Sequence, residues 1–325
     1  MADSIDDHHR FLDDPARLDA FARAVAEIVR PGDVVADLGS GTGLLALFAC
    51  RAGASRVYAV EKTGMAAYAR RIAGDNGFGD RVIGLRGHSQ RVDLPERVDA
   101  VVSDMVGDIG FIKGGADALA DVRARWLKPG GRLMPETSAM WLAPVEHAGL
   151  YTKVDFWSAP VAGIDMSSLR RPAANTLYAH FFETRDLLSA GVEIIDCDHR
   201  TACPGIVRGG ASFVIERAGT LHGLAGWATA RLSPSVTLTT APGAHDRIRR
   251  HNRFLPIDTA VPVLAGDIVD AEFVIRPSDF VMTWAVRCRR GVEIFAESRH
   301  STLEGMLLTR EDLDAAPVSA GAPLS

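Results

Sequence analysis

Short apolar runs alternate with amphipathic stretches along the first part of the chain. In the segment 14–33, apolar residues recur at a helical spacing, and Pro31 and Gly32 mark the end of that helix. The strand-like runs VVADLG (34–39) and VYAVE (57–61) follow, and the alternation of strand and helix continues from there. Continuous apolar strands separated by helices are typical of a parallel sheet covered on both faces. The pattern therefore predicts a doubly wound, Rossmann-like α/β domain, which we place at residues 30–142.

The second part of the chain has a different pattern. Runs such as VEIIDCD (192–198) and FVMTWAVRCRR (280–290) are broken by Gly, Pro and polar turns, which is typical of an antiparallel sandwich or barrel. The stretch at about 147–190 is richer in helix and aromatic residues, and it either packs inside this domain or forms a protruding contact arm. We therefore expect an antiparallel, β-barrel-like domain at 143–312, followed by a flexible Ala/Pro/Ser-rich tail at 313–325.

Composition narrows the possible functions. The chain has 325 residues, is 47% hydrophobic and 24% charged, and carries a net charge of −5 with a pI near 6.1. This charge offers no long-range attraction for nucleic acid. The polar, acidic start and the lack of a long apolar run predict neither a secretory signal nor a membrane span, and hence a cytoplasmic protein. The cysteines lack metal-ligand spacing, which favours reduced thiols and no bound metal: Cys50, Cys197, Cys203 and Cys288.

The loop after the first strand carries the clearest chemical signal. Asp37 ends that strand, a GxGxG sequence (39–43) follows, and Glu61 ends the second strand. Glycines let the backbone approach a ligand, and an acid ending the second strand can accept two ribose hydroxyls. A dinucleotide fingerprint would need glycine at Leu44. The loop resembles the S-adenosylmethionine (SAM) site of class I methyltransferases; a glycine-rich turn without a ligand and a nicotinamide site are the alternatives.

Three longer sequence segments resemble those of the protein arginine methyltransferases. They are DLGSGTGLLALFACRAGASRVYAVE (37–61), RVDLPERVDAVVSD (91–104) and RWLKPGGRLMPE (125–136). Upstream, FLDDPARLDAF resembles the helix that covers the cofactor in that family, and we assign residues 1–29 to it. Downstream, FWSAPVAGIDMSSL (156–169) resembles the arm through which those enzymes dimerise. The resemblance implies a SAM-dependent transferase that forms a homodimer.

The resemblance also assigns roles to individual residues. Arg17 would bind the methionyl carboxylate, Asp37 would line the methionyl end, and Glu61 would bind the ribose. His88 and Ser89 would lie beside the adenine, while Phe11 stands where the family usually has Met near the sulfonium. The full set of predicted cofactor-binding residues is Phe11, Arg17, Asp37, Gly39, Ser40, Gly41, Glu61, Lys62, His88, Ser89 and Asp104.

The acceptor site departs from the family pattern. Arginine methylation relies on two Glu in a hairpin loop; Asp104 stands at the first and Lys113 at the second. A guanidinium about 4 Å from Lys113 would be repelled by roughly 4 kcal/mol at an effective dielectric near 20. A Thr-His-Trp element is likewise replaced, by Ile248-Arg249-Arg250. The two cationic exchanges predict that arginine is not the acceptor.

We therefore expect a small, carboxylate-bearing acceptor derived from an amino acid, methylated on an N, C or O atom. Asp104 is the predicted general base or hydrogen-bonding anchor, and Lys113 is the second predicted catalytic residue. Lys113, Arg249, Arg250 and His251 would bind the acceptor. Two other functions remain open, a protein or peptide arginine methyltransferase and a SAM-binding regulator without catalysis. The simpler interpretations are that the cationic residues face solvent and that Asp104 serves only the cofactor.

Overall fold

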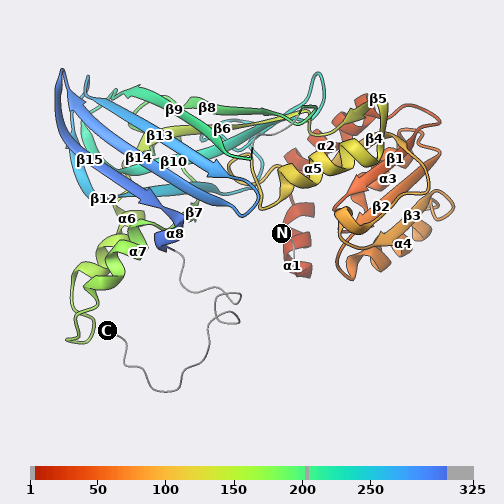
Figure 1. Cartoon of the computed structure of the whole chain (residues 1–325), viewed down its shortest axis with the longest axis horizontal. Helices are drawn as coiled ribbons and strands as arrows, with labels where there is room; N and C mark the ends of the chain where they lie inside the picture. The colour runs from red at the N-terminus through yellow and green to blue at the C-terminus, as the bar shows by residue number, and fades with distance from the viewer. Residues whose placement is uncertain (1–3, 202–204, 306–325) are drawn as a thin grey trace.

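The computed structural model describes residues 4–201 and 205–305, which form two β-sheet systems side by side (Figure 1). The first is a five-stranded parallel sheet in the order β3-β2-β1-β4-β5. Its chain order reverses beside the central strand β1, which is where open α/β sheets bind ligands at the carboxyl ends of their strands. The strands are β1 (Val34–Leu38), β2 (Arg56–Glu61), β3 (Val82–Arg86), β4 (Val98–Ser103) and β5 (Leu127–Leu133).

Both faces of this sheet are covered, as the sequence predicts. Val35 belongs to an apolar cluster with the helices on one face, whereas its neighbour Ala36 belongs to a cluster with Trp126 on the other. Successive side chains of a strand point to opposite faces, so one short apolar run supplies both cores. The helices that follow the strands are α3 (Leu44–Arg51), α4 (Met65–Asp75) and α5 (Gly115–Arg125), with a 3₁₀ turn at Ser89–Arg91.

Two helices precede the sheet, where the apolar spacing predicts one. Ser4 and Asp7 form a capping box that begins α1 (Ile5–Leu12). Asp14 caps α2 (Pro15–Ile28) by accepting a hydrogen bond from the backbone N–H of Arg17, and Pro15 is its first residue. The apolar face of α2 is buried against the parallel domain, which fixes the place of Arg17.

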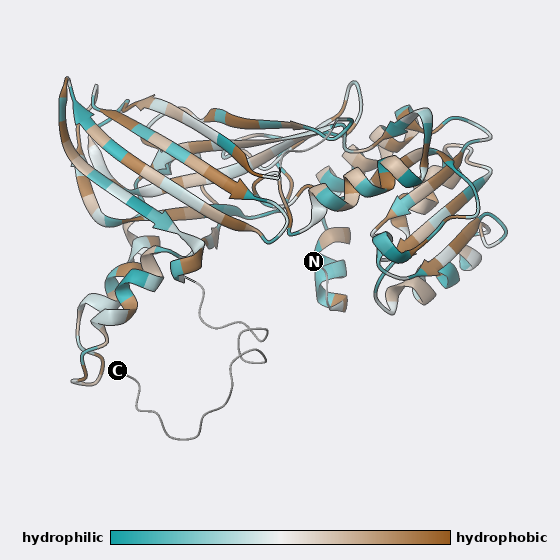
Figure 2. Ribbon diagram, viewed as in Figure 1, coloured by the Kyte–Doolittle hydropathy of each residue, from teal (hydrophilic) through white to brown (hydrophobic). Residues whose placement is uncertain are grey.

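The second sheet system is antiparallel and barrel-like, which confirms the predicted fold class. One sheet has the order β7-β12-β10-β6-β8 with β11 on β10, and the other has the order β15-β14-β13-β9. Brown and teal residues alternate along these strands in Figure 2, and the burial of β14 alternates in the same way. The strands are β6 (Thr137–Val145), β7 (Tyr178–His180), β8 (Val192–Asp198), β9 (Val207–Val214), β10 (Gly219–Arg231), β11 (Thr237–Thr239), β12 (Asn252–Val263), β13 (Ile268–Arg276), β14 (Val281–Arg290) and β15 (Glu293–Ser301).

The predicted domain boundary at 142 falls inside β6. This strand pairs with β8 and β10 along its length, so its residues belong to the antiparallel sheet. The run RLMPETSAM (132–140) reads as one apolar strand, but the chain leaves the parallel sheet after Leu133 and enters the other at Thr137. The predicted tail at 313–325 lies outside the described residues.

A helical segment projects from one end of the barrel (Figure 1). It contains α6 (Ala148–Asp155), α7 (Arg170–Ala174) and 3₁₀ turns at Phe156–Ser158 and Ser167–Leu169. The short α8 (Thr302–Gly305) lies beside α7, and a last 3₁₀ turn spans Thr184–Asp186. Across 4–201 and 205–305, none of the helices combines the length and the apolar character that a bilayer crossing requires.

Candidate active site

The loop between β1 and α3 forms the base of the site. Its glycines Gly39, Gly41 and Gly43 all have positive φ angles. A Cβ on Gly41 would lie 2.9 Å from Cε1 of His8, so glycine lets α1 pack directly onto the loop. Glu61 accepts a hydrogen bond from Gly41 N at 3.1 Å and another from Thr63 N at 2.8 Å. The ends of β1 and β2 are thereby joined around one concave edge.

Three buried polar atoms at this edge have no partner among the residues that the structure describes. They are Nε of Arg17, Oδ1 of Asp37 and Oγ of Ser40. Such atoms are costly unless a ligand pairs with them. A guanidinium, a carboxylate and a hydroxyl suit the carboxylate and ammonium of the methionyl end of SAM, so these residues fit that cofactor.

Asp37 has the most strongly shifted pKa among the acids of the site. Its Oδ2 accepts a hydrogen bond from Ala46 N at 2.9 Å. Burial raises the pKa of Asp37 to about 7; the hydrogen bond from Ala46 opposes this shift, and the nearby charge of Glu61 adds to it. A cationic ammonium beside Asp37 would favour the ionised carboxylate.

Asp104 follows β4 and holds two guanidinium groups. Arg17 forms a close ion pair with its Oδ2, and Nη2 of Arg250 lies 3.3 Å from both carboxylate oxygens. Burial lowers the pKa of Arg17 to about 9, assisted by the charge of Arg250 and opposed by Asp14. Burial also lowers the pKa of Arg250, against the charges of Asp108 and Asp14. Residues from α2, β4 and the β11–β12 connection thus meet at one carboxylate.

The loop after Asp104 is held by its backbone. Gly107 has φ of +73°, and a Cβ there would lie 2.0 Å from the carbonyl oxygen of Phe111. Oγ of Ser138 donates to the carbonyl of Gly110 at 2.8 Å, and Gly114 N donates to that of Pro277 at 3.0 Å. Ile109 and Phe111 of this loop are buried in the core of the barrel. The side chain of Lys113 is exposed.

Arg249 and His251, the sequence neighbours of Arg250, make their contacts with other parts of the chain. Arg249 is exposed; its N–H donates to Oδ2 of Asp14 at 2.6 Å, and its guanidinium donates to the carbonyl of Asp13 at 2.7 Å. The ring of His251 packs against Phe181 at 4.3 Å between centroids. Arg249 therefore joins the β11–β12 connection to the start of α2, and the roles of both residues towards the acceptor stay predictions.

The predicted adenine end is more open. Ser89 is buried, and its carbonyl accepts a hydrogen bond from Arg125 at 2.8 Å. Lys62 and His88 are exposed. Near the sulfonium, the ring of Phe11 lies 4.5 Å from the Arg17 guanidinium carbon. The roles of these residues in cofactor binding also stay predictions.

Three residues of the site lie outside the predicted set of site residues, although the sequence makes His8 a reserve candidate for the general base. His8 packs on Gly41, Asp14 receives the N–H of Arg249, and Asp108 pairs with Arg253 at 2.6 Å. The Asp-Pro step at 14–15 is a sequence signal for a helix cap. His8 and Asp108 carry no comparable signal, because both contacts depend on how the two domains and α1 come together.

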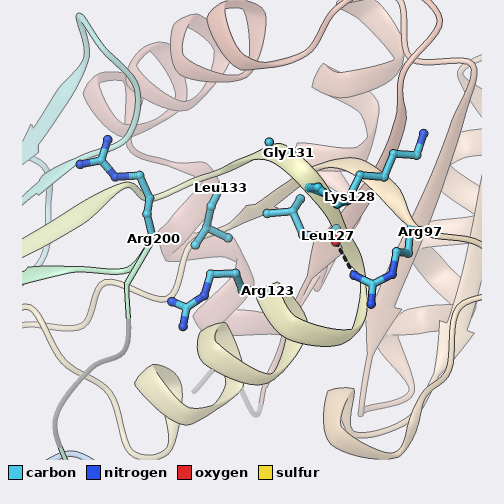
Figure 3. A pocket seen from close by; sticks show the side chains of 9 residues that line it. Arg97, Arg123, Leu127, Lys128, Gly131, Leu133 and Arg200 are labelled. Atoms are coloured by element: carbon cyan, nitrogen blue, oxygen red, sulfur yellow. Dashed lines mark hydrogen bonds between the residues drawn. The ribbon is translucent and has the colours of Figure 1, made fainter.

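Two other features lie apart from this edge. A cavity of about 340 Å³ is surrounded by Arg97, Arg123, Lys128 and Arg200 (Figure 3), and two of these lie near the amino-terminal ends of β4 and β5, opposite the site. Within the described part of the chain, His147, His180 and Asp186 have ligand atoms within 4.8 Å of one another. Nδ1 of His147 already accepts a hydrogen bond from Leu150 N at 3.0 Å, and we assign no metal role to the group.

Comparisons with known proteins agree with this geometry. Residues 21–134 match the family described as ribosomal protein L11 methyltransferase (PrmA), and residues 136–285 match the arginine methyltransferase oligomerization subdomain. Protein arginine N-methyltransferase 6 of Xenopus laevis is 28% identical over 287 residues, covering 84% of both chains. Probable protein arginine N-methyltransferase 6 of Arabidopsis thaliana is 36% identical over 169 residues, covering 51% of this chain and 39% of that relative.

Solved structures show the same fold. Protein arginine methyltransferase 10 of Arabidopsis thaliana superimposes with a TM-score of 0.78 at 23% identity, covering 92% of this chain and 98% of the other. A Trypanosoma brucei PRMT1 enzyme-prozyme heterotetrameric complex with AdoHcy gives 0.79 at 21% identity, covering 90% and 97%.

The fold and the site define a class I methyltransferase whose cofactor is SAM. Within that class, the chain is an arginine methyltransferase-like enzyme, with the parallel domain and the barrel of that scaffold. The predicted small-molecule acceptor is wrong, because the relatives that align over most of the chain are named as enzymes that act on protein arginine. That prediction depended on a fixed charge at Lys113, whose side chain is exposed; its role towards the acceptor stays a prediction.

Proposed function

We propose that this chain is a protein arginine N-methyltransferase that uses Asp104 to hold the acceptor guanidinium. The observation that carries the proposal is that Asp104 already binds two guanidinium groups, those of Arg17 and Arg250. A carboxylate that accepts several N–H groups is suited to a planar guanidinium. The names of the relatives support the same acceptor.

In this proposal, some residues of the site bind the cofactor and Asp104 binds the acceptor. When bound, SAM supplies a methyl group on a sulfonium. Arg17 and Asp37 hold its charged methionyl end, and Glu61 holds its ribose. Asp104 orients the acceptor nitrogen and takes the proton that this nitrogen releases. Arg17 contacts Asp104 in the structure, so its pairing with the SAM carboxylate weakens its hold on Asp104 and leaves that acid more available for the acceptor.

The exposure of Lys113 removes the main electrostatic objection to arginine. The repulsion of roughly 4 kcal/mol assumes an ammonium about 4 Å from the acceptor at an effective dielectric near 20. An exposed side chain on four rotatable bonds is screened by water and salt. The exchange at this position therefore removes a second carboxylate from the loop without placing a fixed cation in the pocket.

A transfer assay with [methyl-³H]SAM tests the proposal. The substrates are a peptide of Gly-Arg repeats and a matched peptide of the same length in which each Arg is replaced by Lys. We expect label in the arginine peptide, recovered as methylarginine after hydrolysis, and at least about 100-fold slower labelling with the Asp104→Asn enzyme. Label in the lysine peptide alone, or SAM binding without transfer to either peptide or to cell extract, would contradict the proposal.

We further propose that the enzyme is a homodimer joined through the segment that contains α6 and α7. The matched family over 136–285 is described as an oligomerization subdomain. The segment exposes apolar side chains: Phe156 is 56% exposed and Ile164 is 59% exposed. Exposed apolar residues on a projecting segment are typical of an interaction surface.

A further inference from the structure

We propose that Arg250 occupies the place of the acceptor guanidinium on Asp104, and that a substrate arginine must displace it. Arg250 is thereby a specificity-determining residue that makes the site selective against weakly binding cations. The inference rests on the proposed function, because it takes the acceptor to be a guanidinium. It concerns a competition for one carboxylate, which can be measured without methyl transfer.

The contacts of Arg250 are those that an acceptor arginine would make. Its Nη2 lies 3.3 Å from each oxygen of Asp104, and its Nη1 donates to the carbonyl of Gly107 at 3.4 Å. Both partners belong to the loop that follows β4 at the carboxyl edge of the sheet. The side chain of Arg250 is only 12% exposed, so it fills this place instead of extending over the surface.

The same contacts are weak enough to be exchanged. Charge-assisted bonds between nitrogen and oxygen are typically about 2.7–2.9 Å long, whereas those of Arg250 are 3.3–3.4 Å. Arg17 also forms an ion pair with Asp104, so two buried cations share one acid. Each guanidinium raises the free-energy cost of burying the other. The electrostatic repulsion between them would be relieved when Arg250 leaves Asp104.

The surroundings allow the side chain to leave while its backbone stays. Ile248 is buried and donates to the carbonyl of Thr239 at 3.0 Å, and Arg249 is fastened to Asp13 and Asp14. The backbone around Arg250 is therefore fixed to both domains. Asp108, which pairs with Arg253, carries a charge near enough to stabilise the protonated form of Arg250.

The test is the affinity of a short arginine peptide, acetyl-Gly-Arg-Gly-amide, for the full chain saturated with S-adenosylhomocysteine. Calorimetry would compare the wild type with Arg250→Ala and Arg250→Gln. Arg287→Ala is the matched control, because it removes the same charge from an exposed ion pair with Glu297 on the barrel. We expect Arg250→Ala to bind the peptide about tenfold more tightly, and the control to stay within about twofold of the wild type.

A second comparison tests whether the gain in peptide affinity depends on the carboxylate of Asp104. In an Asp104→Asn background, Arg250→Ala should no longer improve affinity, because the contested carboxylate is gone. Arg250→Gln keeps most of the side-chain volume and should resemble Arg250→Ala, which separates charge from packing. Melting temperature and S-adenosylhomocysteine affinity would show that each variant is folded.

The outcomes are distinct. Unchanged or weaker peptide binding in both Arg250 variants would overturn the inference, and weaker binding would show that Arg250 holds the acceptor. If the wild type and Arg250→Ala both methylate arginine peptides and have the same Michaelis constant for the peptide, the inference fails and the proposed function stands. If Arg250→Ala binds the peptide more tightly but neither enzyme methylates it, the proposed function fails and the competition at Asp104 stands.

Discussion

Asp104 is surrounded by more positive charge than one carboxylate neutralises. Arg17 and Arg250 both contact it, and both side chains are almost completely buried. Burying a cation is costly unless an acid or a ligand pairs with it. In the proposed function the carboxylate of SAM would supply a second anion for Arg17, which would link cofactor binding to the availability of Asp104.

This linkage predicts how Asp104→Asn affects the two steps. We expect the turnover number to fall at least about 100-fold, because the variant neither holds a guanidinium charge nor accepts a proton. The affinity for S-adenosylhomocysteine should stay within about threefold or improve, because Arg17 is released from its ion pair. Calorimetry and a single-turnover assay measure both quantities. Parallel losses of affinity and turnover would make Asp104 a cofactor ligand only.

Glu61 should show the opposite behaviour. It is buried at the end of β2, where two backbone N–H groups orient its carboxylate. Glu61→Ala removes the predicted acceptor of the ribose hydroxyls, so we expect the affinity for S-adenosylhomocysteine to fall at least about 100-fold. Glu96→Ala is the control, because Glu96 is a more exposed acid paired with Arg56. An affinity within threefold of the wild type for Glu61→Ala would refute its assigned role.

At the scale of elements, two loops at the carboxyl edge of the parallel sheet set the geometry. The loop after β1 places Asp37 and the glycines, and the loop after β4 places Asp104. Both depend on positive φ angles, which glycine adopts without strain. Substitutions in these loops should therefore separate strain from steric collision.

Gly107→Ala and Gly114→Ala make this separation. Both glycines have similar φ angles, +73° and +69°, but a Cβ meets the Phe111 carbonyl at 2.0 Å in the first case and open space in the second. We expect Gly114→Ala to lower the free energy of unfolding by about 1 kcal/mol, and Gly107→Ala by at least about 3 kcal/mol with loss of activity. Urea denaturation measures both. Equal losses would show that the loop after Asp104 rearranges freely.

The loop after β1 predicts a pH dependence of cofactor binding. The pKa of Asp37 is raised to about 7 in the protein without ligand. The ammonium of SAM favours the ionised acid, so affinity for S-adenosylhomocysteine should rise about tenfold between pH 6 and pH 8. In Asp37→Asn, binding should be weaker and this rise should disappear. A rise of the same size in the variant would assign it to another group.

The same shift has the opposite sign for stability. The folded pKa of Asp37 is above the value of about 3.9 in an unfolded chain, so the folded state binds the extra proton between these values. The contribution of Asp37 to the stability of the ligand-free protein is therefore present at low pH and is lost as the pH rises through 7.

At the scale of the whole molecule, the sequence predicts the two domains better than the site that forms where they and α2 pack together. Apolar periodicity suffices to predict the parallel sheet and the barrel, because the spacing of apolar residues in each strand indicates which of its side chains are buried. The site depends on Arg17, Asp104 and Arg250, which are far apart in sequence. Their contact follows from the packing of α2 against both domains, including hydrogen bonds that the Glu27 carboxylate accepts from the Ser233 hydroxyl and the Ser235 backbone N–H. No local pattern reports that packing.

Assembly adds a further level of organisation. The segment that contains α6 and α7 projects from one end of the barrel (Figure 1), and its exposed apolar side chains Phe156 and Ile164 require a partner to be buried. A second copy of the chain is the partner that the proposed homodimer supplies. A symmetric dimer would repeat the same contact twice, which makes it sensitive to changes in this one segment.

Sedimentation velocity tests the dimer. One chain has a mass of 34.8 kDa, so a dimer would have about 70 kDa (2 × 34.8). We expect the wild type to sediment as the dimer at about 10 μM, and the double variant Phe156→Glu, Ile164→Glu as the monomer, because each change places a charge in an apolar interface. Leu264→Glu is the control, since Leu264 is 52% exposed and lies after β12, outside the projecting segment. A wild-type monomer at this concentration, or a double variant that remains dimeric, would show that the segment does not join two copies.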